Sequence, residues 1–159
     1  MKKFILYMAL ITSCMFLQFI GCNDLTPEEA KEVYLDNTEA FHQAIEICGK
    51  YEFVYPISQW KLKLSDEEAE QLSKEELKIL KKLAKSGVMN MSFNENRTFF
   101  AMPRNSATYQ GVIVISSHAE EKDAETLIRN NYAFEQYVEI EQLDDDAYYY
   151  FAWGGLPAD

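Results

Sequence analysis

Gly111-Val112-Ile113-Val114-Ile115 is the stretch of sequence that decides the fold. It is a short, continuous apolar run, and a run of this length is suited to a central β-strand. It stands in the second half of the chain, and polar residues begin directly after it at Ser116. We therefore expect a sheet built around residues 111–115.

Strand patterns lie on the N-terminal side of this run. Residues 88–93 and 97–102 flank Asn94-Glu95-Asn96, and two such runs around a short polar segment are a hairpin signal. Pro103-Arg104-Asn105-Ser106 then favours a turn. The sequence thus predicts two antiparallel strands immediately before the central strand.

More strands are expected after it. The polar segment 116–131 contains Ala124, Leu127 and Ile128 at helical spacing, which indicates one short helix. Residues 134–143 alternate between apolar and acidic side chains, and Asp144-Asp145-Asp146 favours a turn. Residues 147–153 are rich in β-forming aromatics.

Helices are expected in the first half of the chain. Thr26-Pro27-Glu28-Glu29 has the pattern of a capping box with proline in the first turn, and apolar residues then recur at helical spacing as far as Cys48. Gly49 is expected to end this helix. Further capping boxes at Ser65 and Ser73 predict one stepped helix, or two short ones, over residues 66–86.

Helices first and strands later argue for an α+β fold. We expect N-terminal helices packed on one face of an antiparallel β-sheet of about four or five strands. The length suits a single domain over residues 22–159.

Five lysines form the one basic concentration of the chain: Lys74, Lys78, Lys81, Lys82 and Lys85. Helical geometry is expected to spread them around the outer face of their helix, interleaved with Glu75 and Glu76. We interpret them as a solvated helix face rather than as a ligand patch.

The first 22 residues have the features of an export signal. Met1-Lys2-Lys3 is basic, residues 4–20 are apolar, and Gly21-Cys22 follows. This order resembles the signal peptide of a bacterial lipoprotein. The resemblance implies that residues 1–21 are removed and that Cys22 carries the lipid that attaches the chain to a membrane on its extracytoplasmic side. Because Asn23 rather than aspartate follows the cysteine, it implies the outer membrane if the source is Gram-negative.

Two alternatives concern this segment. Ile11-Thr12-Ser13-Cys14 also fits a lipoprotein pattern, but cleavage there would leave residues 15–20 as an exposed apolar end. The segment could also stay uncleaved as a membrane helix, or act as a plain secretory signal. With Cys22 as the anchor, only Asn23, Asp24 and Leu25 form the tether before Thr26, so we expect the domain to work close to the bilayer.

The charge of the chain limits its partners. Thirteen basic and 26 acidic residues follow Gly21, so residues 22–159 have a formal charge of −13. A surface this acidic repels nucleic-acid phosphates, and nucleic-acid binding is therefore not expected. It is compatible with a basic protein partner. Cys48 is the third cysteine, and on the apolar side of its helix it is expected to be a buried, unreactive thiol.

The aromatic run of residues 148–153 is the most unusual stretch of the chain. One row of it should be core, and an exposed row would suit protein or carbohydrate contacts. The candidate binding surface therefore comprises Tyr148, Tyr150 and Trp153, together with His118 after the central strand. Burial of both rows, by helices and by a loop, is the alternative.

No catalytic or metal-ligating pattern is found in the sequence. The aspartates 144–146 lack the spacing of a calcium loop, and His42 and His118 are not part of a zinc motif. We expect neither a metal nor a cofactor. The favoured hypothesis is a non-catalytic envelope module that binds a protein or another envelope component. The alternatives are an inhibitor or immunity-type partner of a basic envelope enzyme, an envelope enzyme with His118 as general base, and a structural component of the envelope.

Overall fold

A computed structural model describes residues 24–51, 57–58, 61–62, 64–94, 96–103, 108–120, 123–132 and 137–153. The expectations for residues 1–22, including the lipid site Cys22, lie outside these ranges. The helices are α2 (Pro27–Leu35), α3 (Thr38–Tyr51), α4 (Asp66–Gln71), α5 (Lys74–Ser86) and α6 (Ala124–Tyr132). The strands are β1 (Ile57–Ser58), β2 (Lys61–Leu62), β3 (Asn90–Phe93), β4 (Arg97–Met102), β5 (Thr108–Ile115), β6 (Tyr137–Gln142) and β7 (Ala147–Trp153).

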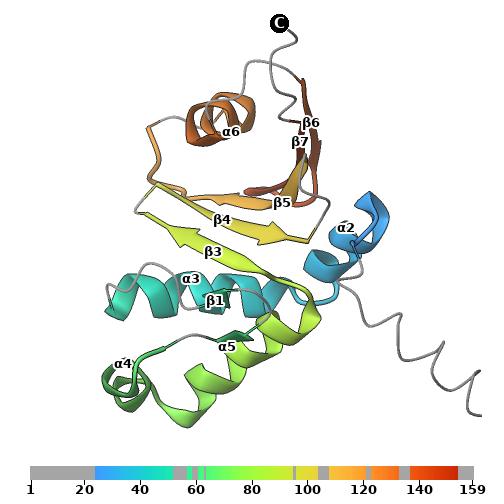
Figure 1. Cartoon of the computed structure of the whole chain (residues 1–159). Helices are drawn as coiled ribbons and strands as arrows, with labels where there is room; N and C mark the ends of the chain where they lie inside the picture. The colour runs from blue at the N-terminus through green and yellow to red at the C-terminus, as the bar shows by residue number, and fades with distance from the viewer. Residues whose placement is uncertain are drawn as a thin grey trace, which may run out of the picture.

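One antiparallel sheet organises the described part of the chain (Figure 1). Its strand order is β2-β1-β3-β4-β5-β7-β6. The predicted central strand is confirmed, because β5 is the longest strand and pairs with β4 on one side and β7 on the other. The α+β class is also confirmed. Strands β3 to β7 match the expected five, and the two-residue strands β1 and β2 extend the edge beyond β3.

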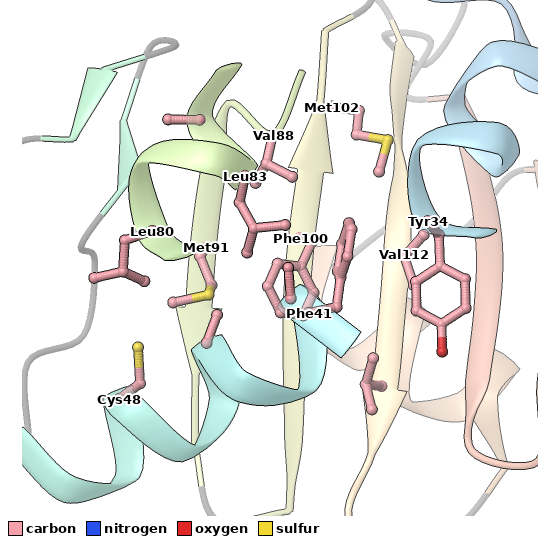
Figure 2. Packing of buried hydrophobic residues seen from close by; sticks show 14 of the residues in the cluster. Tyr34, Phe41, Cys48, Leu80, Leu83, Val88, Met91, Phe100, Met102 and Val112 are labelled. Atoms are coloured by element: carbon pink, nitrogen blue, oxygen red, sulfur yellow. The ribbon is translucent and has the colours of Figure 1, made fainter. Parts of the chain in front are cut away.

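Helices α2, α3 and α5 cover one face of the sheet. Phe41 of α3 lies at the centre of this layer, with its ring 5.1 Å from the Tyr34 ring and 4.5 Å from the Phe100 ring, both edge-on. Leu80 and Leu83 of α5 pack into the same cluster, which Figure 2 shows against the strands. The three helices form because each has an apolar side that this cluster buries.

The opposite face is covered by α6. Leu127 and Ile128 pack there against Phe99, Ile113 and Tyr150 of the sheet. Figure 1 shows α6 on the far side of the sheet from α3 and α5. The predicted short helix is thus confirmed, but the expectation that helices occupy only one face is wrong. An apolar strand needs cover on both faces, and α6 provides it for β5 and β7.

The N-terminal helical segment is two helices rather than one. It breaks at Asp36 and Asn37, where the Asn37 side-chain amide donates to the Val33 carbonyl at 2.8 Å and the Thr38 hydroxyl donates to the Tyr34 carbonyl at 3.1 Å. These short polar side chains satisfy the carbonyls that the helix leaves open, so they stabilise the break. Gly49 does not end the helix as expected, because α3 continues to Tyr51.

The predicted helix starts at Thr26 and Ser73 are confirmed. Each hydroxyl accepts from the N–H of a glutamate three residues on, and the glutamate accepts from the capping N–H in return. Helix α5 ends at Gly87, whose φ of 117° lies in the left-handed region that favours glycine. These caps define where α2 begins and where α5 begins and ends.

Candidate functional site

The aromatic strand β7 is buried on both sides over most of its length. Tyr149 faces the three-helix layer, and Tyr150 lies under α6 with its ring 5.8 Å from the Phe99 ring. Tyr150 is fully buried, so it does not contribute to an accessible surface as the sequence had suggested. The cause is α6, which covers the face that a β-period pattern alone leaves open. Trp153 ends β7, and its side chain lies outside the described part.

Tyr148 and His118 remain accessible, at one end of the sheet. Tyr148 is half-buried and lines a cavity of about 220 Å³ together with Ser116, Ser117 and Asp145. His118 is exposed in the turn that follows β5, and its backbone N–H donates to the Ser116 hydroxyl at 3.3 Å. Two of the four candidate binding residues thus lie near one polar turn.

This turn borders a second cavity of about 320 Å³. The two cavities share Ile115, Ser116 and Asp146, and we call them together the Ser116 cleft. Three turns meet here. The Ser116 N–H donates to the Asn96 carbonyl at 2.8 Å, and the Ile115 N–H donates to the Asp146 carbonyl at 2.8 Å. Backbone hydrogen bonds therefore fix the floor of the cleft.

Arg97 is the cationic residue of the cleft. It follows the turn in which the Asn94 side chain accepts from the N–H groups of Asn96 and Arg97, each at 2.9 Å. Its guanidinium carbon lies 5.5 Å from the centre of the Phe99 ring. Its Nε is buried and has no hydrogen-bond partner among the described residues. A buried donor without an acceptor among the described residues is unusual.

Helix α3 closes the other wall of the cleft with His42 and Glu46, which lie one turn apart. His42 Nε2 is 3.5 Å from the Tyr34 hydroxyl. Burial, and then the negative charges of Asp144 and Asp146, raise the pKa of Tyr34 well above its usual range. The aspartate turn therefore acts electrostatically on this wall, and the tyrosine stays neutral.

The aspartates 144–146 form the expected turn between β6 and β7. Leu143 and Asp144 donate their N–H groups to the Ala147 carbonyl at 2.9 and 3.2 Å, and the Asp144 side chain accepts from the Asp145 N–H. Across the described residues, the acidic, histidine and cysteine side chains do not gather into a group that would hold a metal ion. Asp146 of this turn and Glu46 of α3 line the same cavity as Arg97.

Cys48 lies where the sequence predicts, on the buried side of α3. Burial raises the pKa of its thiol to about 12. The thiolate is the reactive form of cysteine, so this residue is a packing element of the core.

Sequence reasoning missed Arg97, Glu46, Asp146 and Ser116 as members of a site. The i, i+4 spacing of His42 and Glu46 is visible in the sequence and places them on one helix face. Their proximity to Arg97 and Asp146 is not visible, because it depends on three turns meeting at the same end of the sheet.

Comparison of the chain with protein-family models, with curated proteins and with solved structures finds no match. Over the described ranges, every helix is too short or too polar to cross a bilayer. The site must therefore be interpreted from its own geometry.

Proposed function

We propose that this chain is a lipid-anchored protein of the bacterial cell envelope that acts by binding a protein partner. The membrane attachment is supported by the lipoprotein-like sequence that ends at Cys22. The binding activity is supported by one observation above the others, the Ser116 cleft, where Glu46, Asp146 and Arg97 line one cavity. No cofactor and no nucleic acid are part of the proposal.

The start of the domain is clamped to the sheet, which supports action close to the membrane. The Leu25 N–H donates to the Pro103 carbonyl at 3.2 Å, and the Leu25 carbonyl accepts from the Gln110 side chain at 2.8 Å. Gln110 is itself buried and accepts from the Tyr149 hydroxyl at 3.1 Å. A lipid on Cys22 would thus be three residues, at most about 11 Å, from a fixed point of the fold.

The charges of the cleft favour a peptide segment that carries a basic group. Glu46 and Asp146 line the larger cavity, and Asp145 and Asp146 line the smaller one. They would pair with a lysine or arginine of the partner, while the Arg97 guanidinium would donate to a carbonyl or carboxylate beside it. This arrangement and the net acidity favour the inhibitor or immunity-type alternative, in which the chain binds to a basic envelope enzyme.

The anchor is tested by metabolic labelling with palmitate. We expect the wild type and Cys14→Ala to incorporate the label and Cys22→Ala to lose it. Label that persists in Cys22→Ala would remove the anchor assignment. Loss of label in Cys14→Ala would move the anchor to the first cysteine.

The binding proposal is tested by photocrosslinking in intact envelopes. A photoreactive residue replaces Ser117, which is exposed at the rim of the cleft, and in the control it replaces Glu39, which is exposed on α3. We expect one protein adduct from position 117 and none from position 39.

Asp145→Asn with Asp146→Asn should weaken that adduct about tenfold or more, as the loss of charge-assisted contacts predicts. The matched control is Glu32→Gln with Glu39→Gln, which removes the same charge elsewhere and should leave the adduct intact. Equal adducts from positions 117 and 39 would refute a specific site.

A further inference from the structure

The five lysines of α5 form a stripe on its outer face, and the expectation that Glu75 and Glu76 are interleaved with them is wrong. At about 100° per residue, positions 74, 78, 81, 82 and 85 fall within about 100° of arc. Leu80 and Leu83 lie on the opposite side of α5, in the core. Glu76 points away toward Lys50 and Tyr51, and Glu75 lies at the edge of the stripe. We call these five residues the lysine stripe.

The lysine stripe is exposed and mostly unpaired. All five side chains are exposed, and they line a groove of about 680 Å³ with Asn37, Leu77 and Ser86. Lys78 approaches Glu75 at 4.0 Å, but both side chains are about four-fifths exposed, so this pair is weak. Among the described residues, the other four make no ion pair. Lys31 and Lys50, by contrast, each hold a carboxylate at 2.8 and 2.9 Å.

Such a stripe is exceptional in this protein. It carries five of the thirteen basic residues that follow Gly21, on a chain whose formal charge past that point is −13. Neighbouring ammonium groups repel one another, and with few carboxylates beside them their charge stays available to an anion. The rest of the surface is acidic and would be repelled by an anionic membrane surface. The stripe therefore determines which side of the domain can approach such a surface.

The stripe ends near the point where the chain would meet its anchor. Leu25 is bonded to Pro103, which follows β4, and the Ala101 carbonyl of β4 accepts from the Met89 N–H at 2.7 Å. Met89 comes three residues after Ser86, the end of α5. Figure 1 likewise places the end of α5 beside the start of β3, on the side of the sheet that α2 and α3 occupy. These two hydrogen bonds connect the fixed end of the tether, through β4, to the C-terminal end of α5.

We propose that the lysine stripe of α5 rests on the anionic headgroups of the bilayer that holds the chain. The inference depends on the proposed lipid anchor at Cys22. The anchor confines the domain to the surface, and the stripe then selects one orientation by binding phosphate groups, as basic clusters beside lipid anchors do. A lipid anchor and a polybasic face act together in this way.

The test uses the full chain, purified from membranes in detergent and reconstituted into vesicles. One set contains phosphatidylcholine only, and the other contains about 30% phosphatidylglycerol. A fluorophore on Ser86→Cys reports the distance to a headgroup quencher, and Asn130→Cys on α6 is the control position. Cys48 is buried and Cys22 would be acylated, so neither takes the label. Palmitate labelling of the same preparation checks the anchor.

We expect quenching at position 86 to rise at least threefold with phosphatidylglycerol, and to return to the phosphatidylcholine value near 0.5 M NaCl. Position 130 should change little. Lys78→Gln, Lys81→Gln and Lys82→Gln together should abolish the rise. The control variant combines Ser117→Asp, Asn130→Asp and Gln142→Glu. It lowers the net charge by the same three units as the lysine substitutions and should keep the rise in quenching.

Each contrary result has a distinct meaning. If the chain is acylated but quenching at position 86 does not respond to phosphatidylglycerol or to the three lysine substitutions, the proposed orientation is wrong. The proposed anchor is not affected by that result. A chain that is not acylated at Cys22 removes the proposed anchor and this inference with it. A photocrosslink from position 86 to an acidic protein, with no phosphatidylglycerol effect, would assign the stripe to that protein and refute the membrane contact.

Discussion

The two faces of the sheet are covered in different ways. Among the described residues, nineteen buried apolar side chains lie between the sheet and helices α2, α3 and α5, whereas eight lie between the sheet and α6. Tyr149 and Tyr150 are neighbours in β7, yet each belongs to a different cluster. One strand therefore links a large core to a small one, and both border the Ser116 cleft, the large one through Val114 and the small one through Ile115.

The two clusters should contribute differently to stability and to the shape of the cleft. The larger cluster should hold most of the stability of the fold, since buried apolar area is the main favourable contribution. The smaller cluster lies beside the turns that form the cleft, where close packing matters for geometry more than for total stability. Substitutions on the two faces, and at their junction, can test this difference.

The largest effect is expected at Gly111, where β4, β5 and β7 meet. A Cβ on Gly111 would lie 2.0 Å from the backbone oxygen of Phe100 and 3.0 Å from the Tyr150 hydroxyl. Because the first of these is backbone, the strands must separate, and Gly111→Ala should cost about 4 kcal/mol or more. The free energy of unfolding in urea measures it. Gly49→Ala is the control: its Cβ would meet only Phe93, at an ordinary 3.4 Å, and should stabilise α3 by up to about 1 kcal/mol. A mild Gly111→Ala would show that β4 and β5 can shift.

A pair of truncations then compares the two faces directly. Phe41→Ala should cost about 4 kcal/mol, because the ring is fully buried between Tyr34 and Phe100. Ile128→Ala should cost about 2 kcal/mol, because its smaller cluster can relax toward the cleft. Urea unfolding of both variants gives the ratio. Equal losses would mean that α6 is as important to stability as the three-helix layer.

The strands and caps were predictable because their signals are local. The hairpin turn at residues 94–96, the capping boxes at Thr26 and Ser73 and the apolar run of residues 111–115 each act over a few residues. The break at Asn37 was missed because apolar periodicity continues across it, although Asn37 and Thr38 carry the hydrogen bonds that stabilise it.

The burial of Tyr150 and the composition of the cleft were not predictable from the sequence. Alternation along β7 separates two rows of side chains but does not say what covers each row. That cover comes from α6, a helix about twenty residues away in the chain, and sheet pairing alone brings Arg97 and Asp146 to the same cavity. The lysine stripe, in contrast, follows from helical geometry alone and could have been found.

Cys48 offers a smaller test on the larger face. Cys48→Ser places a hydroxyl in a fully buried apolar position and should cost about 1.5 kcal/mol. With its thiol pKa raised to about 12, the wild type should react with a thiol reagent at pH 8 only through opening of the fold. Comparison of the reaction rate in native buffer and in urea measures this. Fast labelling in native buffer would mean that α3 does not bury this side.

The smallest effect concerns the polar attachment of α5 to α3 on the same face. Hydrogen bonds from Lys50, and then from the Ser73 backbone and side chain, lower the pKa of Glu76 to about 2 from an ordinary value near 4.5. A depressed carboxyl pKa contributes stability that is present above the unfolded value and is lost as the pH falls through the folded value. We therefore expect Glu76→Gln to be less stable than the wild type at pH 7 by less than about 1 kcal/mol, since the group lies near the surface. That difference should shrink between about pH 4.5 and pH 2, as unfolding measured across this range would show.

Glu67→Gln on α4 removes an exposed carboxylate without a hydrogen bond among the described residues, and its difference from the wild type should not follow this curve. A Glu76→Gln difference that stays constant to pH 2 would mean that apolar packing alone, without the cap and the Lys50 pair, holds α5 on the larger core.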